Sequence, residues 1–388
     1  MLYKERIMDD VANALAGSRL AAPELWAELQ PYRFEDQYHL VRTHRRFVTW
    51  GLCELLCGES VRLTAVDPER AVESAELAVL LSDLLKEEEP GCARRLYRLR
   101  GYAWAHDGNA RRVQGDLRNA DESFSIADAW WEAGAELGDA LGYEPMFLEL
   151  KSSMRIAQRR FPEAFEILDR MYAIHAAGGG DGHLAGRTLL KKALALAEMG
   201  EPEQAIGLLQ RAEPMISRER DPRLFVCLRH NLLWNLATLE AYAEAKVLLP
   251  EVAALFRELG NPVDLLRLRW AEGRVAAGLR QTEDAIQIFE GLRQDFAARG
   301  IGYDAALVTL ELTALYAQAG SMADVKRLSL EMAGIFQAQD VPREALAALL
   351  FFQKAAERER ATAKLAREIG VFLEKLRSDP GLRFERLR

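Results

Sequence analysis

The sequence predicts an all-α protein, an α-solenoid in which antiparallel helical hairpins stack one on the next. Two observations carry this prediction. A small residue recurs one turn into a predicted helix, and its spacing becomes constant in the second half of the sequence. Prolines recur in the turns between hairpins, separated by one or two repeats of the same length. A fixed period of about 40 residues is typical of helical-repeat proteins, because each repeat buries its apolar face against its neighbours.

The repeat is clearest at the turn of residues 200–205, which leads into an apolar face made by Ile206, Leu209 and Ala212. The equivalent small residues, each after a polar or proline-containing turn, are Ala71, Ala120, Ala164, Ala205, Ala245, Ala285 and Val325. Their separations shorten as far as Ala205 and are identical from there to Val325. We therefore expect about seven hairpins over residues 37–359, with each marker near the start of a second helix.

The turns between hairpins carry a second marker in the same phase, formed by the pairs Asp221-Pro222, Asn261-Pro262 and Val341-Pro342. Asp and Asn are good helix N-caps. Proline suits the first helical position because its missing N–H would be unpaired there anyway. These pairs therefore predict where first helices begin.

Composition narrows the class of protein. A sequence of 388 residues with 49% hydrophobic residues could form two globular domains or one elongated array, and the periodicity favours the array. The formal net charge of −8 argues against a nucleic-acid binder. The charged start and the lack of a long apolar run predict a cytoplasmic protein without a membrane partner. Four cysteines fit a reducing compartment.

Residues 1–36 do not match the repeat and form a predicted N-terminal extension or cap. We expect two short helices here, Tyr3–Ala16 and Pro23–Leu29, broken at Gly17-Ser18 and at Gln30-Pro31. The extension is also a candidate for partner binding or self-association. The first hairpin is expected to begin with one long helix from Glu35 to about Cys57, followed by a helix capped at Asp67.

The second hairpin resembles the tetratricopeptide repeat (TPR) family. The pattern consists of Trp104, Gly108, Ala120, Phe124 and Ala127, and Gly273 with Phe289 repeats part of it. The resemblance covers about residues 40–360 and implies a right-handed superhelix that binds proteins or peptides. The unit here is about 40 residues, where the family has 34, and most hairpins lack the Trp and Gly. Longer-helix variants of the family occur in bacterial signalling and transcription-regulator proteins.

Later elements follow the same logic. In the helix starting near Thr282, apolar residues at a three-and-four spacing form one face, with Ala285, Phe289 and Phe296 among them. Residues 342–357 form a further predicted first helix, and residues 360–388 a charged capping helix with a basic tail. An array of this kind needs polar caps at its ends.

Two stretches have alternative interpretations. The glycine-rich segment 176–182 lacks the motifs of a nucleotide loop, so we predict a flexible connection and a possible hinge. Cys53 and Cys57 are four residues apart on one helical face, with His39 and His44 upstream and Cys92 downstream. Buried free thiols are favoured there over a metal site, because no closely spaced cysteine pair is present. We expect neither a metal nor a cofactor.

The TPR resemblance implies that first helices line a concave groove. Counting back from each marker places these residues on the inner wall: Asn109, Arg112, Glu149, Ser153, Arg187, Lys191, His230, Trp234, Arg267, Trp270 and Arg274. Their net basic charge and two tryptophans would suit an acidic peptide or the C-terminus of another protein. The alternative is that the basic residues pair with neighbouring Glu and that the tryptophans belong to the core between repeats.

Three functions follow from these observations. The protein is predicted to be a non-catalytic adaptor or scaffold that binds a protein or peptide, which requires only the array. The second interpretation is a sensing regulatory subunit that controls a transcription or protease partner. An enzyme would need clustered titratable groups in a pocket, and the sequence contains no catalytic motif that indicates one.

Overall fold

Helices and the turns between them make up the residues that the structure describes. These residues are 2–64, 66–86, 93–137, 141–177, 181–259, 262–337, 343–378 and 381–384 of a computed structural model. No strand occurs among them. The α-helices are α1 (Leu2–Leu29), α2 (Phe34–Thr43), α3 (Trp50–Leu63), α4 (Pro68–Leu84), α5 (Ala93–Gln114), α6 (Leu117–Ala133), α7 (Glu144–Ala157), α8 (Phe161–Ala176), α9 (Gly182–Met199), α10 (Pro202–Ala212), α11 (Pro222–Thr238), α12 (Tyr242–Leu259), α13 (Pro262–Gly278), α14 (Thr282–Ala298), α15 (Gly302–Gln318), α16 (Met322–Gln337), α17 (Arg343–Glu357) and α18 (Ala363–Ser378).

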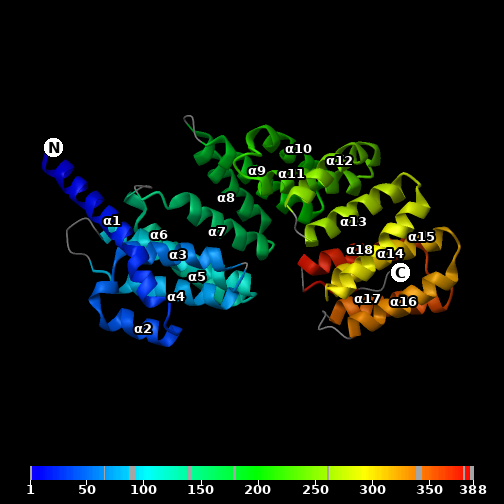
Figure 1. Ribbon diagram of the computed structural model, residues 1–388, viewed down its shortest axis with the longest axis horizontal. Helices are drawn as coiled ribbons and strands as arrows, with labels where there is room; N and C mark the ends of the chain where they lie inside the picture. The colour runs from blue at the N-terminus through cyan, green and yellow to red at the C-terminus, as the bar shows by residue number, and fades with distance from the viewer. Residues whose placement is uncertain are drawn as a thin grey trace. The chain divides into compact units, whose positions relative to one another are not determined.

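The fold divides into two compact units, unit 1 (Met1–Ile174) and unit 2 (His175–Arg388). In unit 2, consecutive helices from α9 to α17 pack on one another as a series of hairpins (Figure 1). Residues 178–180 of the predicted hinge lie outside the described residues, so the hinge and the predicted domain boundaries stay predictions.

The repeat markers confirm the period. Each marker lies in the helix that follows a hairpin turn, and each is completely buried: Ala71, Ala120, Ala164, Ala205, Ala245, Ala285 and Val325. A side chain larger than alanine or valine at these points would separate the two helices of a hairpin. The regular spacing therefore reports one packing position repeated along the array.

The hairpin turns share a backbone conformation with the same period. A residue with positive φ ends the first helix in seven described turns, at Gly115, Arg159, Gly200, Glu240, Arg280, Gly320 and Glu359. At Gly200, where φ is 84°, the next amide of Glu201 donates to the Leu196 carbonyl at 3.0 Å. This is the arrangement of a Schellman C-cap, in which a left-handed residue lets the helix end with its carbonyls paired.

Packing between glycine and phenylalanine explains the TPR-like motif. A Cβ atom on Gly108 would lie 2.7 Å from the Phe124 ring, and one on Gly273 would lie 2.4 Å from the Phe289 ring. Both rings are buried. The glycine of the first helix thus leaves the space that the aromatic ring of the second helix fills.

The prediction of two short N-terminal helices was wrong, because α1 runs unbroken through Gly17 and Pro23. Contacts with α3 support the helix next to Gly17, where the helix propensity of the sequence is low. Gly51 lies so close that a Cβ there would be 2.2 Å from the Ser18 carbonyl oxygen. Arg19 donates two hydrogen bonds of 2.7 Å to the carboxylate of Glu54. Tertiary packing here outweighs the low helix propensity of glycine and proline.

The single long helix expected from Glu35 to Cys57 is also divided. It consists of α2, a 3-10 turn η1 (Arg45–Phe47) and α3. Thr49 caps α3 by accepting a hydrogen bond from the Leu52 amide at 3.3 Å. A threonine that caps a helix has extended backbone, which a continuous helix does not allow.

The C-terminal helix folds back onto an earlier repeat. α17 forms as expected, and α18 then packs along α15, where the Tyr303 hydroxyl donates to the Leu373 carbonyl. One buried cluster, which includes Phe289, Leu310 and Leu373, joins α13 to α18. Most of the predicted basic tail, from residue 385 onward, lies outside the described residues.

Two further findings concern metals and membranes. Cys53 and Cys57 are buried free thiols, as the favoured interpretation had it, and Cys92 lies outside the described residues. Over the described ranges, no group of three or more His, Cys, Asp or Glu side chains is placed to hold a metal ion. None of the described helices has the length and apolar character needed to span a bilayer.

Candidate functional site

A pocket of about 480 Å³ opens in unit 2. The first helices of three successive hairpins, α11, α13 and α15, supply most of its wall, and the end of α12 and the folded-back α18 complete it. The lining residues are Arg223, Val226, Cys227, His230, Asn231, Trp234, Phe256, Leu259, Asp264, Arg267, Trp270, Asp304, Leu307 and Glu374.

Local sequence fixes where these helices begin. Asp221 caps α11 by accepting a hydrogen bond from the Leu224 amide at 2.9 Å, with Pro222 at the first helical position. Asp264 and Asp304 occupy the third position of α13 and of α15, one repeat apart. An acidic side chain in the first turn interacts favourably with the helix dipole. The repeat therefore delivers an acidic residue to the pocket wall from each of these two helices.

Aromatic rings form a connected series in the pocket wall. Trp234 and Trp270 meet edge to face with ring centroids 5.5 Å apart, and Trp270 contacts Phe296 in the same way at 5.9 Å. His230 packs edge to face on Phe256 at 5.3 Å. Trp270 is only 5% exposed, whereas Trp234 is partly exposed. Trp270 thus belongs to the core and Trp234 is available to a ligand.

Arg274 anchors this series. Its guanidinium lies 4.2 Å from the Trp234 ring centroid and donates to Glu311 at 2.7 Å and to Glu374 at 2.8 Å. The indole N–H of Trp270 donates to the same Glu311 oxygen at 2.7 Å. Burial acts against the charged guanidinium, but the two carboxylates outweigh it and raise the pKa of Arg274. A largely buried arginine with this set of partners keeps its charge and fixes the Trp234 ring.

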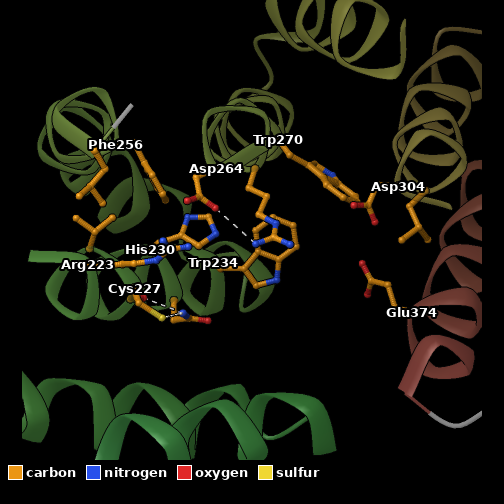
Figure 2. Close-up of a pocket in the computed structure, with 14 residues that line it drawn as sticks. Arg223, Cys227, His230, Trp234, Phe256, Asp264, Trp270, Asp304 and Glu374 are labelled. Carbon is orange, nitrogen blue, oxygen red and sulfur yellow. Dashed lines mark hydrogen bonds and ion pairs between the residues drawn. The ribbon is translucent and has the colours of Figure 1, made fainter. Parts of the chain in front are cut away.

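The pocket has charges of both signs at different sides (Figure 2). Arg223, Cys227 and His230 lie on one side, and Asp304 and Glu374 lie on the other, with Trp234 between them. Arg267 is half exposed and contacts Asp264 at 3.6 Å, longer than a hydrogen bond.

His230 is held neutral in the pocket wall. Burial, with the nearby positive charge of Arg267, lowers the pKa of its imidazole from 6.5 to about 4. Its Nδ1 atom is buried and lacks a hydrogen-bond partner in the part of the protein that the structure describes. A proton on that atom would gain no acceptor, so protonation is disfavoured.

The structure brings together part of the predicted site. His230, Trp234, Arg267 and Trp270 line the pocket, and Arg274 stacks behind it. Arg187 and Lys191 lie on α9 and do not line it. The other four residues lie in unit 1, where Arg112 donates to Asn109 at 2.9 Å and the Ser153 hydroxyl donates to the Glu149 carbonyl at 3.0 Å.

The expected net basic charge of the wall is largely compensated. Arg274 is paired with two glutamates and Arg267 lies beside Asp264. These pairs match the alternative that the sequence left open for the basic residues. Whether the predicted residues hold a partner stays a prediction.

Several lining residues were missed from the sequence. Leu307 was within reach of the same counting, because it precedes Val325 by the same interval that separates Arg267 from Ala285. Asp304 lies one turn earlier in that helix. No repeat signal points to Glu374, since it reaches the pocket only because α18 packs along α15.

Comparison with known proteins supports the class that these features define, a TPR-like α-solenoid. No protein-family model and no curated protein matches the sequence. Among solved structures, aspartyl phosphate phosphatase F from Bacillus subtilis matches with a TM-score of 0.55 and 15% identity, over 96% of this chain and 97% of that one. A Rap protein complexed with Competence and Sporulation Factor matches with a TM-score of 0.55 and 13% identity, over 84% of this chain and 94% of that one. At these identities the likeness establishes the fold alone.

Proposed function

We propose that this protein binds a protein or peptide in the unit 2 pocket and acts as a non-catalytic adaptor or scaffold. The pocket carries the proposal. Its volume of about 480 Å³ lies in the range of known ligand sites. Trp234 is partly exposed in its wall, fixed by the guanidinium of Arg274. Tryptophan and arginine are enriched among the residues that carry most of the binding energy of an interface, and tryptophan buries a large apolar area.

A peptide- or protein-sensing regulator is the second candidate. The Rap protein of similar fold is complexed with Competence and Sporulation Factor, which favours a sensing role for this type of array. In this case a bound ligand would alter how the array acts on a transcription or protease partner. We propose no phosphatase activity from the likeness to aspartyl phosphate phosphatase F, since that likeness is one of fold.

Capture from a randomised hexapeptide library tests the binding function. The immobilised protein is incubated with the library, and retained peptides are identified by mass spectrometry. We expect Trp234→Ala to retain about tenfold less peptide than wild type, because it removes the exposed anchor. Trp130→Ala is the matched control, since Trp130 lies in α6 of unit 1 and does not line the pocket.

A second variant separates loss of binding from loss of folding. Cys227 is partly exposed in the pocket wall, so Cys227→Trp fills the pocket without removing an aromatic contact. Equal retention by wild type, Trp234→Ala and Cys227→Trp would exclude this pocket as the site. Retention no greater than on blank resin would reject peptide binding.

A further inference from the structure

Most charged groups in the pocket are separated by sign; Asp264, 3.6 Å from Arg267, is the exception. Arg223 of α11 and Arg267 of α13 lie on the side of His230, where the charge of Arg267 helps to lower the pKa of that imidazole. Asp304 of α15 and Glu374 of α18 lie on the opposite side (Figure 2). A pocket with this division presents a positive and a negative end to one ligand.

The positive end remains able to bind an anion. Arg267 is 51% exposed, and its nearest carboxylate, Asp264, is 3.6 Å away. Arg223 is exposed at the start of α11. A guanidinium that is exposed and only loosely paired keeps N–H donors for a planar carboxylate, which it binds in a bidentate manner.

The negative end has a fixed position. Glu374 is held by Arg274 through a hydrogen bond of 2.8 Å, and its side chain is still 42% exposed. Asp304 is buried at the start of α15. Glu374 and Glu311 share the one guanidinium of Arg274, so two carboxylates meet a single positive charge at this end. An ammonium or guanidinium group of a ligand would suit it.

Apolar side chains also form part of the pocket wall. Trp234 stands between the charged sides in Figure 2, and Val226, Phe256 and Leu307 also line the pocket. Burial of an apolar side chain against these groups would supply affinity, while the two ends would set the direction of the ligand.

We infer that the pocket binds a bipolar peptide segment, with a carboxylate at Arg223 and Arg267, a cationic group at Asp304 and Glu374, and an apolar side chain on Trp234. This inference rests on the proposed function and adds the charge pattern and direction of the ligand. The charges come either from the two termini of a short peptide or from acidic and basic side chains, and both sources present the same chemistry.

Two hexapeptide libraries test the inference and distinguish the sources. One library has free termini and only uncharged side chains. The other has acetylated and amidated termini and includes Asp, Glu, Lys and Arg. If the termini supply the charges, we expect the protein to capture peptides of the first library about tenfold better than the same peptides with blocked termini. If side chains supply the charges, we expect a similar preference in the second library for peptides with one acidic and one basic residue over the other peptides.

Single neutral substitutions then assign each charge to its end. Arg267→Gln and Arg223→Gln are expected to lose the preference for a carboxylate and keep that for a cationic group. Glu374→Gln is expected to do the opposite. Arg269→Gln is the matched control, because Arg269 lies on the same helix but pairs with Asp295 at 2.5 Å and does not line the pocket.

Each outcome decides the inference. If the wild-type protein captures peptides but shows no preference for those that carry both charges, the bipolar pocket is contradicted and the proposed binding function still stands. If Arg267→Gln and Glu374→Gln lose the preference for the same charged group of the peptide, the assignment of the carboxylate and the cationic group to opposite ends is contradicted. If wild type captures no peptide from any library, the proposed function fails and the inference fails with it. Circular dichroism of each variant ensures that the comparison uses folded protein.

Discussion

The guanidinium of Arg274 lies 4.2 Å from the centre of the Trp234 ring, and both residues belong to first helices of adjacent hairpins, α13 and α11. Glu311 of α15 and Glu374 of α18 hold that guanidinium through hydrogen bonds of 2.7 and 2.8 Å. One arginine therefore connects four helices around the pocket, and its loss should affect both stability and the position of Trp234.

Arg274→Gln is expected to lower the free energy of unfolding by about 3 kcal/mol, because it leaves two carboxylates without their cation. Glu374→Gln should cost only about 1 kcal/mol, since an amide oxygen still accepts the hydrogen bond and Glu311 remains. Urea denaturation measures both changes, and the double variant gives the coupling between the two side chains. Equal losses for the two single variants would contradict the central role of Arg274.

Gly273 is expected to tolerate no side chain. Gly273→Ala would place a Cβ atom 2.4 Å from the buried Phe289 ring and should cost about 2 kcal/mol, as overpacked cores do. Gly370→Ala is the matched control, because Gly370 lies in α18 with no atom near the added Cβ, and it should stabilise by about 0.5–1 kcal/mol. Adding Phe289→Leu to Gly273→Ala should recover part of the loss. Calorimetric melting of wild type and the three variants tests this, and a neutral Gly273→Ala would show that the hairpin adjusts freely.

Replacing each of two glycines in one hairpin with alanine should have opposite effects on stability, because only one of them has a left-handed backbone conformation. Gly200 has a φ of 84°, so Gly200→Ala should cost about 1–2 kcal/mol. Gly207 lies within α10 with open space around it, so Gly207→Ala should stabilise by about 0.5–1 kcal/mol. Glu240 adopts the same turn with a φ of 58°, and Glu240→Gly should relieve strain there. Urea midpoints that shift in the same direction for Gly200→Ala and Gly207→Ala would contradict the assigned turn geometry.

The stability of the protein should depend on pH through His230. In the folded state, burial lowers the pKa of this imidazole to about 4 from its usual 6.5. As pH falls below 6.5, the unfolded state therefore binds a proton that the folded state does not. This contribution to stability is fully present above pH 6.5 and is lost down to about pH 4, by about 1 kcal/mol per pH unit. Thermal melting between pH 7 and pH 4 measures how steeply stability falls with pH. The slope should be shallower for His230→Gln than for wild type. Identical slopes would mean that His230 titrates normally.

The sequence predicted the repeat because its period depends on local contacts. The small residue at Ala205 and at Ala285 fills the same place in each hairpin, so spacing alone locates it. The division between α2 and α3 and the unbroken α1 were missed, because they depend on the Thr49 cap and on contacts of Ser18 with Gly51. Neither feature carries a periodic signal.

The pocket was predictable only in part, for a related reason. His230 and Trp234 follow the register of the first helices, so counting from the markers placed them on one wall. Glu374 arrives from a helix 100 residues after Arg274 in the sequence. Its position depends on which earlier helix α18 covers, and an amphipathic face does not specify that choice.

The most direct test of the pocket as a binding site uses Cys227, which lines it and is partly exposed. The alkylation rate of this thiol by N-ethylmaleimide is measured by mass spectrometry with and without a saturating peptide from the library. Because burial raises the pKa of Cys227, the reaction is run at mildly alkaline pH. We expect the bound peptide to slow alkylation of Cys227 about tenfold by covering it. An unchanged rate with the peptide fully bound would place the ligand elsewhere on the protein.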